Sequence, residues 1–115
     1  MQLIDQTTNT VISQNVKVAD TFWSRFMGLM FRKSIDNEEA LVIEPCNNVH
    51  MFFMKFEIDV VFVDKDDTIC YIQENLRTGH ISKYVSKARY VVELPRGRVK
   101  EKNIKIHNKI KMLIK

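Results

Sequence analysis

Glycine, proline and cysteine are scarce in this chain, and each shortage excludes a class of protein. The 115 residues contain three glycines, two prolines and two cysteines. Two cysteines form at most one disulfide bond, so the chain is not a disulfide-stapled secreted domain. The glycines stand far apart in the sequence, which excludes the glycine-rich loop of nucleotide-binding proteins.

Two other recognisable sites are missing from the sequence. It has no Cys-x-x-Cys pair, so the usual structural zinc site is not expected. It has no Gly-x-Ser-x-Gly segment, which argues against a serine hydrolase built on a nucleophile elbow.

Long apolar segments are also absent. The apolar run Val60–Val63 is far too short to span a bilayer. The N-terminus has no basic stretch followed by an apolar one, so we expect no signal peptide and a cytoplasmic location. We further expect no membrane association, no cofactor and a monomeric state.

Length and composition predict a single domain over residues 1–115. Hydrophobic residues make up 45% and charged residues 28% of the chain, as in ordinary globular proteins. The net charge is +4, but the segment from Arg96 onward has eight basic residues and one acid. In one interpretation this basic end is an edge strand whose lysines discourage pairing with other chains. In the other it binds an anionic partner. Because no aromatic side chain accompanies it, nucleic-acid binding is not favoured.

The apolar pattern predicts a mainly β, α+β domain. We expect a small barrel-like or rolled, mostly antiparallel sheet with one main helix against it. The Ile58–Val63 run is continuously apolar, which predicts burial on both faces. The expected strands are Gln2–Asp5, Thr10–Val18, Ala40–Ile43, Met51–Phe53, Ile58–Val63, Thr68–Gln73, Tyr90–Leu94, Ile104–Ile106 and Lys109–Ile114.

The main helix is predicted near residues 20–30, with Asp20 as its N-cap. A single helical turn is predicted at Ser82–Ser86. The apolar residues of the main helix recur at helical spacing and define one broad face: Phe22, Trp23, Phe26, Met27 and Met30.

The segment from Cys46 to Lys55 contains the residues best suited to chemistry. In one interpretation Cys46 is a thiolate nucleophile and His50 is its base. In another, Cys46, His50 and Met54 form a soft metal site for copper(I) or zinc. In the structural interpretation Cys46 and Met54 pack in the core. We assign no catalytic and no metal-binding residue from these alternatives.

Two carboxylates, Asp59 and Glu93, lie in otherwise apolar strands. A buried carboxylate costs free energy unless it is paired or accepts hydrogen bonds. Asp59 is therefore expected to form an ion pair, to accept hydrogen bonds from the backbone as a clamp, or to be an acid in a pocket. Glu93 is expected either to lie on an exposed strand face or to be an acid in a pocket. We expect a ligand pocket where the 20–30 helix meets the 46–59 segment. Its candidate residues are Arg25, Asn47, His50, Met54, Asp59 and Glu93.

Three ordered motifs resemble one family. They are Arg25 to Met30, Cys46 to Asp64 and Ala88 to Gly97, and they resemble the bacterial and archaeal family called domain of unknown function 192. The resemblance runs from about Val11 to Ile114 and implies a compact, mostly β, barrel-like domain with a helix, without an assigned activity. The residues that match its pattern are Arg25, Gly28, Met30, His50, Met54, Asp59, Asp64, Glu93 and Gly97. The chain departs from that pattern at Glu57, Asp67 and His107-Asn108.

The sequence therefore predicts a non-catalytic binding module for an unidentified small molecule or peptide. One alternative is a thiol-dependent enzyme or hydrolase that uses Cys46 and His50. The other is anion or nucleic-acid binding through the basic C-terminus.

Overall fold

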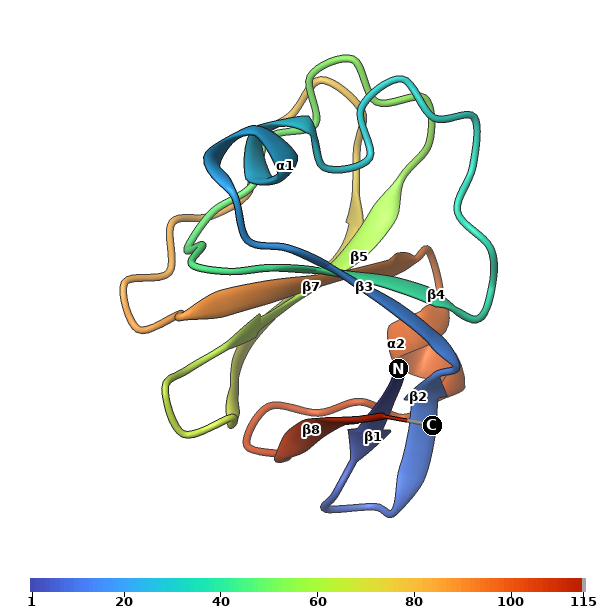
Figure 1. Cartoon of the computed structure of the whole chain (residues 1–115), viewed down its shortest axis with the longest axis vertical. Helices are drawn as coiled ribbons and strands as arrows, with labels where there is room; N and C mark the ends of the chain where they lie inside the picture. The colour runs from blue at the N-terminus through green and yellow to red at the C-terminus, as the bar shows by residue number, and fades with distance from the viewer. Residues whose placement is uncertain (115) are drawn as a thin grey trace.

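The computed structural model describes residues 1–114 and shows two β-sheets with two short helices (Figure 1). The smaller sheet has the order β2-β1-β8, and the larger has the order β3-β4-β7-β5-β6. The strands are β1 (Gln2–Asp5), β2 (Thr10–Ser13), β3 (Asn15–Ala19), β4 (Glu39–Ile43), β5 (Ile58–Val63), β6 (Ile69–Leu76), β7 (Tyr90–Pro95) and β8 (Ile110–Leu113); the helices are α1 (Phe22–Met27) and α2 (Arg98–Glu101).

This architecture confirms the mainly β, α+β prediction. Paired strands run antiparallel except β3 and β4, which are parallel. The strands form two separate sheets, not one closed barrel.

The prediction of one strand over Thr10–Val18 is wrong, because the chain bends at Gln14. The backbone N–H groups of Gln14 and Asn15 both donate to the carbonyl of Glu38, at 3.1 and 2.9 Å. The Ser13 hydroxyl donates to the same carbonyl. These contacts send β2 to the smaller sheet and β3 to the larger one.

Three other short elements were also predicted wrongly. Residues 51–53 form a turn, with Phe53 at a φ of 61°, instead of a strand. Residues 82–86 form a loop instead of a helical turn, because the N–H groups of Ser82 and Val85 donate to carbonyls of residues 49 and 47. Residues 104–106 form no strand, since the chain is still leaving α2, which the sequence pattern did not predict.

Helix α1 is shorter than the predicted 20–30 helix. Its N-cap is Thr21 and not Asp20: the Thr21 hydroxyl accepts from the N–H of Ser24, and the Ser24 hydroxyl accepts from the N–H of Thr21. This reciprocal pair is a capping box. Gly28 ends the helix at a φ of 46°, a conformation that glycine adopts at little cost.

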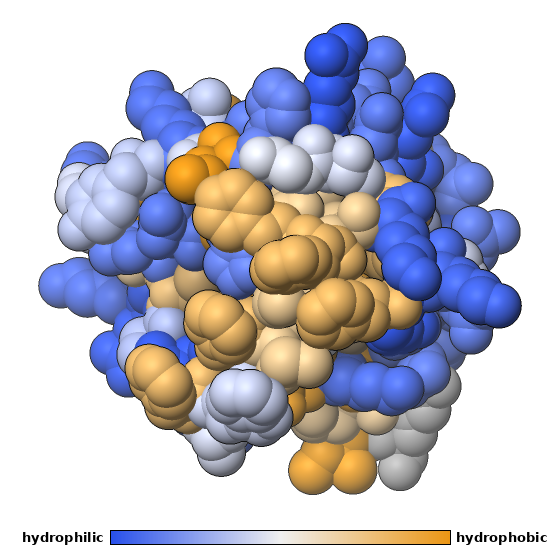
Figure 2. All heavy atoms as spheres, turned by 90° about the horizontal axis from the view of Figure 1, so that it is seen from above, coloured by the Kyte–Doolittle hydropathy of each residue, from blue (hydrophilic) through white to orange (hydrophobic). Residues whose placement is uncertain are grey.

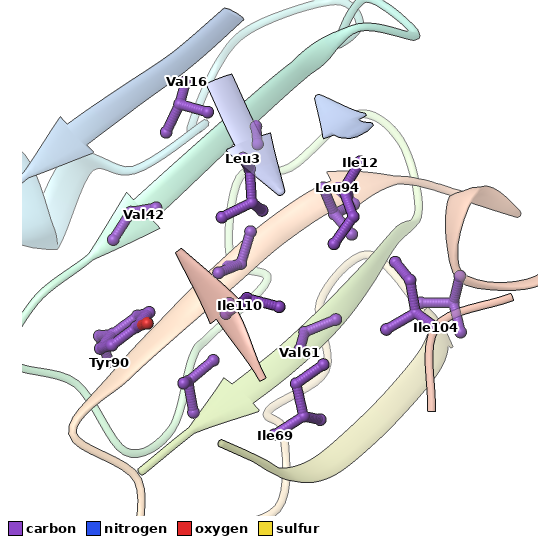
Figure 3. Close-up of a cluster of buried hydrophobic side chains, with 14 residues drawn as sticks. Leu3, Ile12, Val16, Val42, Val61, Ile69, Tyr90, Leu94, Ile104 and Ile110 are labelled. Atoms are coloured by element: carbon purple, nitrogen blue, oxygen red, sulfur yellow. The ribbon is translucent and has the colours of Figure 1, made fainter. Parts of the chain in front are cut away.

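The larger sheet has a hydrophobic core on each face, so every residue of β4, β5 and β7 is buried. This confirms the expected two-sided burial of Ile58–Val63. On one face the smaller sheet and α2 cover the first core (Figures 1 and 3). On the other face α1 and the loops cover the second core (Figure 1). The second core contains Ala19, Leu29, Leu41, Ile43, Val49, Met51, Met54, Ile58, Val60, Phe62, Leu76 and Val91.

Candidate functional site

Glu93 lies in the middle of the larger sheet. It is on β7, paired with Leu41 of β4 on one side and Val60 of β5 on the other. Side chains alternate between the faces of a strand, so Glu93 shares a face with Val91 and points into the second core. The residue is only 4% exposed. An exposed strand face therefore does not explain Glu93, and that structural interpretation is wrong.

The Glu93 carboxylate has an unsatisfied oxygen. Oε1 is buried and has no hydrogen-bond partner among the described residues. Burial raises the pKa of this carboxyl from 4.5 to about 8, because the charged form is poorly solvated there. At neutral pH the side chain is therefore mostly protonated. Buried polar atoms in folded proteins are almost always paired, so this oxygen marks a place where a further group fits.

A cavity of about 50 Å³ lies beside Glu93. We call it the Glu93 cavity. Its lining comes from α1 and the turn after it, from β4, from the 46–54 segment and from β7: Arg25, Phe26, Met27, Gly28, Leu29, Met30, Ile43, Cys46, Asn48, Val49, His50, Met54 and Glu93. Gly28 lies next to Glu93, because a Cβ there would be in ordinary van der Waals contact with Glu93 Oε1, at 3.9 Å.

Cys46 lines the cavity as a thiol. Burial raises its pKa, and the negative charge of Glu93 adds to the rise, while a hydrogen bond and Arg25 offset part of it. The Cys46 Sγ donates to the carbonyl of Asn48 at 3.0 Å. A thiolate nucleophile needs the opposite environment, one that lowers the thiol pKa.

His50 belongs to a row of rings at the mouth of the cavity. Its ring centroid lies 5.7 Å from that of Phe26 and 5.3 Å from that of Phe52. Its Nδ1 accepts from the backbone N–H of Phe52 at 3.3 Å. Trp23 extends the row, 6.0 Å from Phe26. No hydrogen bond joins His50 to Cys46 in the part of the chain that the structure describes.

Apolar side chains gather in the middle of this face of the molecule, surrounded by hydrophilic ones (Figure 2). The exposed fraction is 77% for Phe22 and 66% for Trp23 and Phe53. The apolar face that helical spacing defines on the 20–30 helix does not pack in the core, because none of the α1 residues is buried. We call the exposed rings of Phe22, Trp23, Phe26, Phe31, Phe52 and Phe53 the aromatic surface. Exposed apolar patches of this kind mark binding surfaces more often than chance positions do.

Arg25 lies between the cavity and solvent. Its Nε donates to the carbonyl of Thr21 at 3.3 Å, and its Nη1 donates to the carbonyl of Pro45 at 3.2 Å. These bonds tie the helix to the chain that leaves β4. Arg25 Nη2 donates no hydrogen bond within residues 1–114, so Arg25 keeps N–H groups for a further acceptor.

The structure brings four of the six predicted pocket residues to one cavity. Arg25, His50, Met54 and Glu93 line it, and Asn47 lines a shallower hollow that adjoins it through Cys46. That these residues bind a ligand stays a prediction.

Asp59 does not line the Glu93 cavity. It is on β5 beside Val60, so it points to the opposite face of the sheet, toward α2. Its carboxylate accepts from the backbone N–H groups of Asn75, Gly97 and Val99, at 3.0, 3.0 and 3.1 Å. Asp59 is a backbone clamp.

Other features bear on the remaining predictions. Within residues 1–114, no three His, Cys, Asp or Glu side chains gather closely enough to hold a metal ion. In the same described residues, no helix is long and apolar enough to cross a membrane. In the basic C-terminal segment, Arg98 is buried and pairs with Glu38 and Glu101, and Arg96 lies 3.7 Å from Glu57.

Sequence relatives are uncharacterised archaeal proteins. A UPF0127 protein from Thermococcus sibiricus is 35% identical over 94% of this chain and 72% of its own length. A UPF0127 protein from Pyrococcus horikoshii is 34% identical over 83% of this chain and 84% of its own.

Two solved structures share the fold. One is a protein of unknown function from Novosphingobium aromaticivorans, with a TM-score of 0.84, 20% identity and coverage of 96% of this chain and 82% of the other. The second is a candidate transcription regulator from Sinorhizobium meliloti, with a TM-score of 0.79, 22% identity and coverage of 96% and 89%.

The sequence motifs lie on the sheet, helix and turns that form the Glu93 cavity and the Asp59 clamp. The model of the family DUF192, described as an uncharacterised ACR family, matches residues 3–112. The chain belongs to the DUF192 family.

Proposed function

We propose that this chain is a non-catalytic binding module for a small molecule or peptide. The ligand places a polar group against Glu93 and its apolar body on the aromatic surface. The observation that carries the proposal is the buried Oε1 of Glu93, which lacks a partner in a cavity that opens beside exposed rings.

The size of the cavity supports this division of the ligand. Pockets that enclose a drug-sized molecule measure about 300–1,000 Å³. The Glu93 cavity measures about 50 Å³ and admits only a small group. The rest of the ligand must therefore lie outside, where Phe22, Trp23 and Phe26 offer apolar area.

A thiol-dependent enzyme receives less support. Its nucleophile would be Cys46, whose pKa is raised and whose Sγ already donates to a backbone carbonyl. Its base would be His50, whose Nδ1 accepts from the chain and whose ring lies between Phe26 and Phe52. A non-catalytic binding site requires neither a thiolate at Cys46 nor a free base at His50.

An NMR screen of a fragment and short-peptide library tests the proposal. We expect hits to shift the amide signals of Gly28, Cys46 and Glu93, and to change the fluorescence of Trp23, the only tryptophan. Phe26→Ser should weaken each hit roughly tenfold, since it removes a ring at the cavity mouth. Met112→Ser, on β8 of the other sheet, is the matched control and should leave affinity unchanged. A library without a hit at these amides, or equal weakening by both variants, would refute the proposal.

A further inference from the structure

We infer that the group admitted to the Glu93 cavity is a primary ammonium carried next to an aromatic ring. This inference rests on the proposed binding function and names the class of ligand. Its source is either a free arylalkylamine or the N-terminus of a peptide that begins with an aromatic residue.

The first step is the direction of the missing hydrogen bond. An ionised carboxylate accepts hydrogen bonds and cannot donate them. Glu93 Oε1 is buried without a donor, and the neighbouring strands offer only Leu41 and Val60 opposite it. The ligand must therefore supply a donor if Glu93 is to be buried in its charged form.

The second step is the balance of charge. The titratable or charged side chains that face Glu93 across the cavity are Arg25 from α1 and Cys46 and His50 from the loop. Arg25 donates to the carbonyls of Thr21 and Pro45 and makes no ion pair with Glu93. A buried carboxylate without a cation is costly, and a cationic ligand offsets that cost. An anionic group could accept a hydrogen bond only from protonated Glu93 and would be repelled by the ionised form.

The third step is the character of the remaining wall. Phe26 presents a ring, and Met27, Met30 and Met54 contribute thioether groups. Aromatic faces attract cations, and thioether sulfur is a weak acceptor. The lining is therefore electron-rich, which favours a cation over a neutral donor.

The fourth step is size and attachment. A cavity of about 50 Å³ favours a compact ammonium over a bulkier planar guanidinium with its stem. Phe26 and His50 line the cavity and belong to the row of rings with Trp23, so a phenyl ring attached close to the ammonium would lie beside this row. In a peptide, the first carbonyl offers an acceptor to the free N–H groups of Arg25.

Isothermal titration with matched probes tests the inference. The probes are 2-phenylethylamine, 2-phenylethanol and 3-phenylpropanoate, which share the ring and differ in the charge of the end group. We expect 2-phenylethylamine to bind at least about tenfold more tightly than the alcohol, as charge-assisted pairing predicts, and the carboxylate to show no binding. Equal affinity of amine and alcohol would overturn the inference and leave the binding function standing. Absence of binding by all three, together with an empty library screen, would refute both.

Proton release gives a readout on the wild-type protein. Glu93, with its pKa of about 8, must ionise to pair with the ammonium, so binding at pH 7 should release most of one proton. The affinity for 2-phenylethylamine should rise at least about tenfold from pH 6 to pH 8 for the same reason. His50 also faces the cavity, so the titration is repeated with His50→Gln, in which the release should persist. Release near zero in the wild-type protein would overturn the inference.

Variants and peptides complete the test. Glu93→Gln should weaken the amine at least about tenfold and the alcohol less than threefold, because only the amine loses a charged partner. Glu74→Gln, which removes an exposed carboxylate from β6, is the matched control and should change neither affinity. Phe-Ala-Ala-amide and its N-acetylated form separate the two sources: tighter binding of the free peptide than of 2-phenylethylamine indicates a peptide N-terminus, and the reverse order indicates a free amine. Equal affinity of the free and acetylated peptides, together with no preference for the amine over the alcohol, would overturn the inference.

Discussion

At the scale of the residue, two carboxylates on neighbouring strands have opposite surroundings. Asp59 and Glu93 are both buried, in strands β5 and β7 that pair with each other. Asp59 accepts three backbone hydrogen bonds, whereas one oxygen of Glu93 accepts none. The first side chain therefore contributes to the fold, and the second is held in the fold at a cost that other contacts offset.

That cost makes stability depend on pH. The pKa of Glu93 is about 8 in the folded chain against 4.5 ordinarily, so unfolding releases a proton between these values and stability falls as pH rises through that window. The loss is at most about 1.4 kcal/mol for each pH unit. Glu93→Gln removes the titrating group. The melting temperature of Glu93→Gln minus that of wild type should therefore increase from pH 5 to pH 8. This difference should stay level above pH 8.

Two further variants complete this experiment. Glu74→Gln, which changes an exposed carboxyl, should show no such trend. Asp59→Asn should be destabilised by roughly 2–4 kcal/mol, because its amide NH₂ would face backbone donors. If the melting temperatures of Glu93→Gln and wild type change in parallel between pH 5 and pH 8, the raised pKa of the buried Glu93 carboxyl is contradicted.

The sequence predicted that both acids were unusual, because each interrupts an apolar run. It did not predict which one was satisfied. The two residues face opposite sides of the sheet because Val60, and not Asp59, pairs with Glu93. This register depends on the pairing of strands about thirty residues apart, which a local pattern does not contain. The Asp59 clamp likewise needs N–H groups from the distant Gly97 and Val99.

At the scale of the element, α1 shows why helical spacing alone misleads. The spacing of Phe22, Trp23 and Phe26 is that of an amphipathic helix, and such a face normally packs in a core. Here the second core is already closed by Leu29, Met51 and Met54, and the helix has only six residues. The aromatic rings remain on the surface. A hydrophobic stripe indicates that a face needs a partner, and does not indicate that the partner is in the same chain.

The turn at Phe53 supports a binding role for this surface. Phe31 and Phe53 both have positive φ, 66° and 61°, and their ring centroids lie 5.4 Å apart. A bulky residue in the left-handed region costs about 1–2 kcal/mol, and Phe53 is 66% exposed, so burial does not repay that cost. Strained backbone of this kind concentrates at functional positions.

We therefore predict that Phe53→Asn changes the free energy of unfolding by no more than about 0.5 kcal/mol. Asparagine tolerates the left-handed region, and the relief of strain offsets the lost stacking with Phe31. Phe62→Ala is the comparison, since Phe62 is fully buried, and should cost about 3–5 kcal/mol. Urea unfolding of each variant measures its change in the free energy of unfolding. A loss above 2 kcal/mol for Phe53→Asn would mean that this ring stabilises the fold.

At the scale of the whole molecule, the two faces of the larger sheet are closed in different ways. The first core lies between two hydrogen-bonded sheets, and Figure 3 shows its side chains meeting between them. The second core is covered by α1 and by loops, joined through scattered backbone bonds such as Met51 to His80 and Ser82 to Val49. The sequence predicted strands at β4, β5, β6 and β7 of the larger sheet, but merged β3 with β2. It did not predict this division, because the bend at Gln14 that separates the sheets depends on the distant carbonyl of Glu38.

This asymmetry predicts the order in which backbone amides exchange with deuterium. Amides of β5 and β7 are paired on both sides in the middle of the sheet, so they should exchange only through global unfolding. Amides of residues 46–54 and 80–85 should exchange faster, because local opening of the loop layer breaks few bonds. A ligand that bridges α1 and the 46–54 segment should slow the second group and leave the first unchanged. Mass spectrometry of exchanged peptides measures both rates. Equal exchange rates for the loop amides and the β5 amides would show that the layer over Glu93 is as rigid as the sheet. A ligand would then have to enter the Glu93 cavity beside Arg25 and His50 without any opening of the loops.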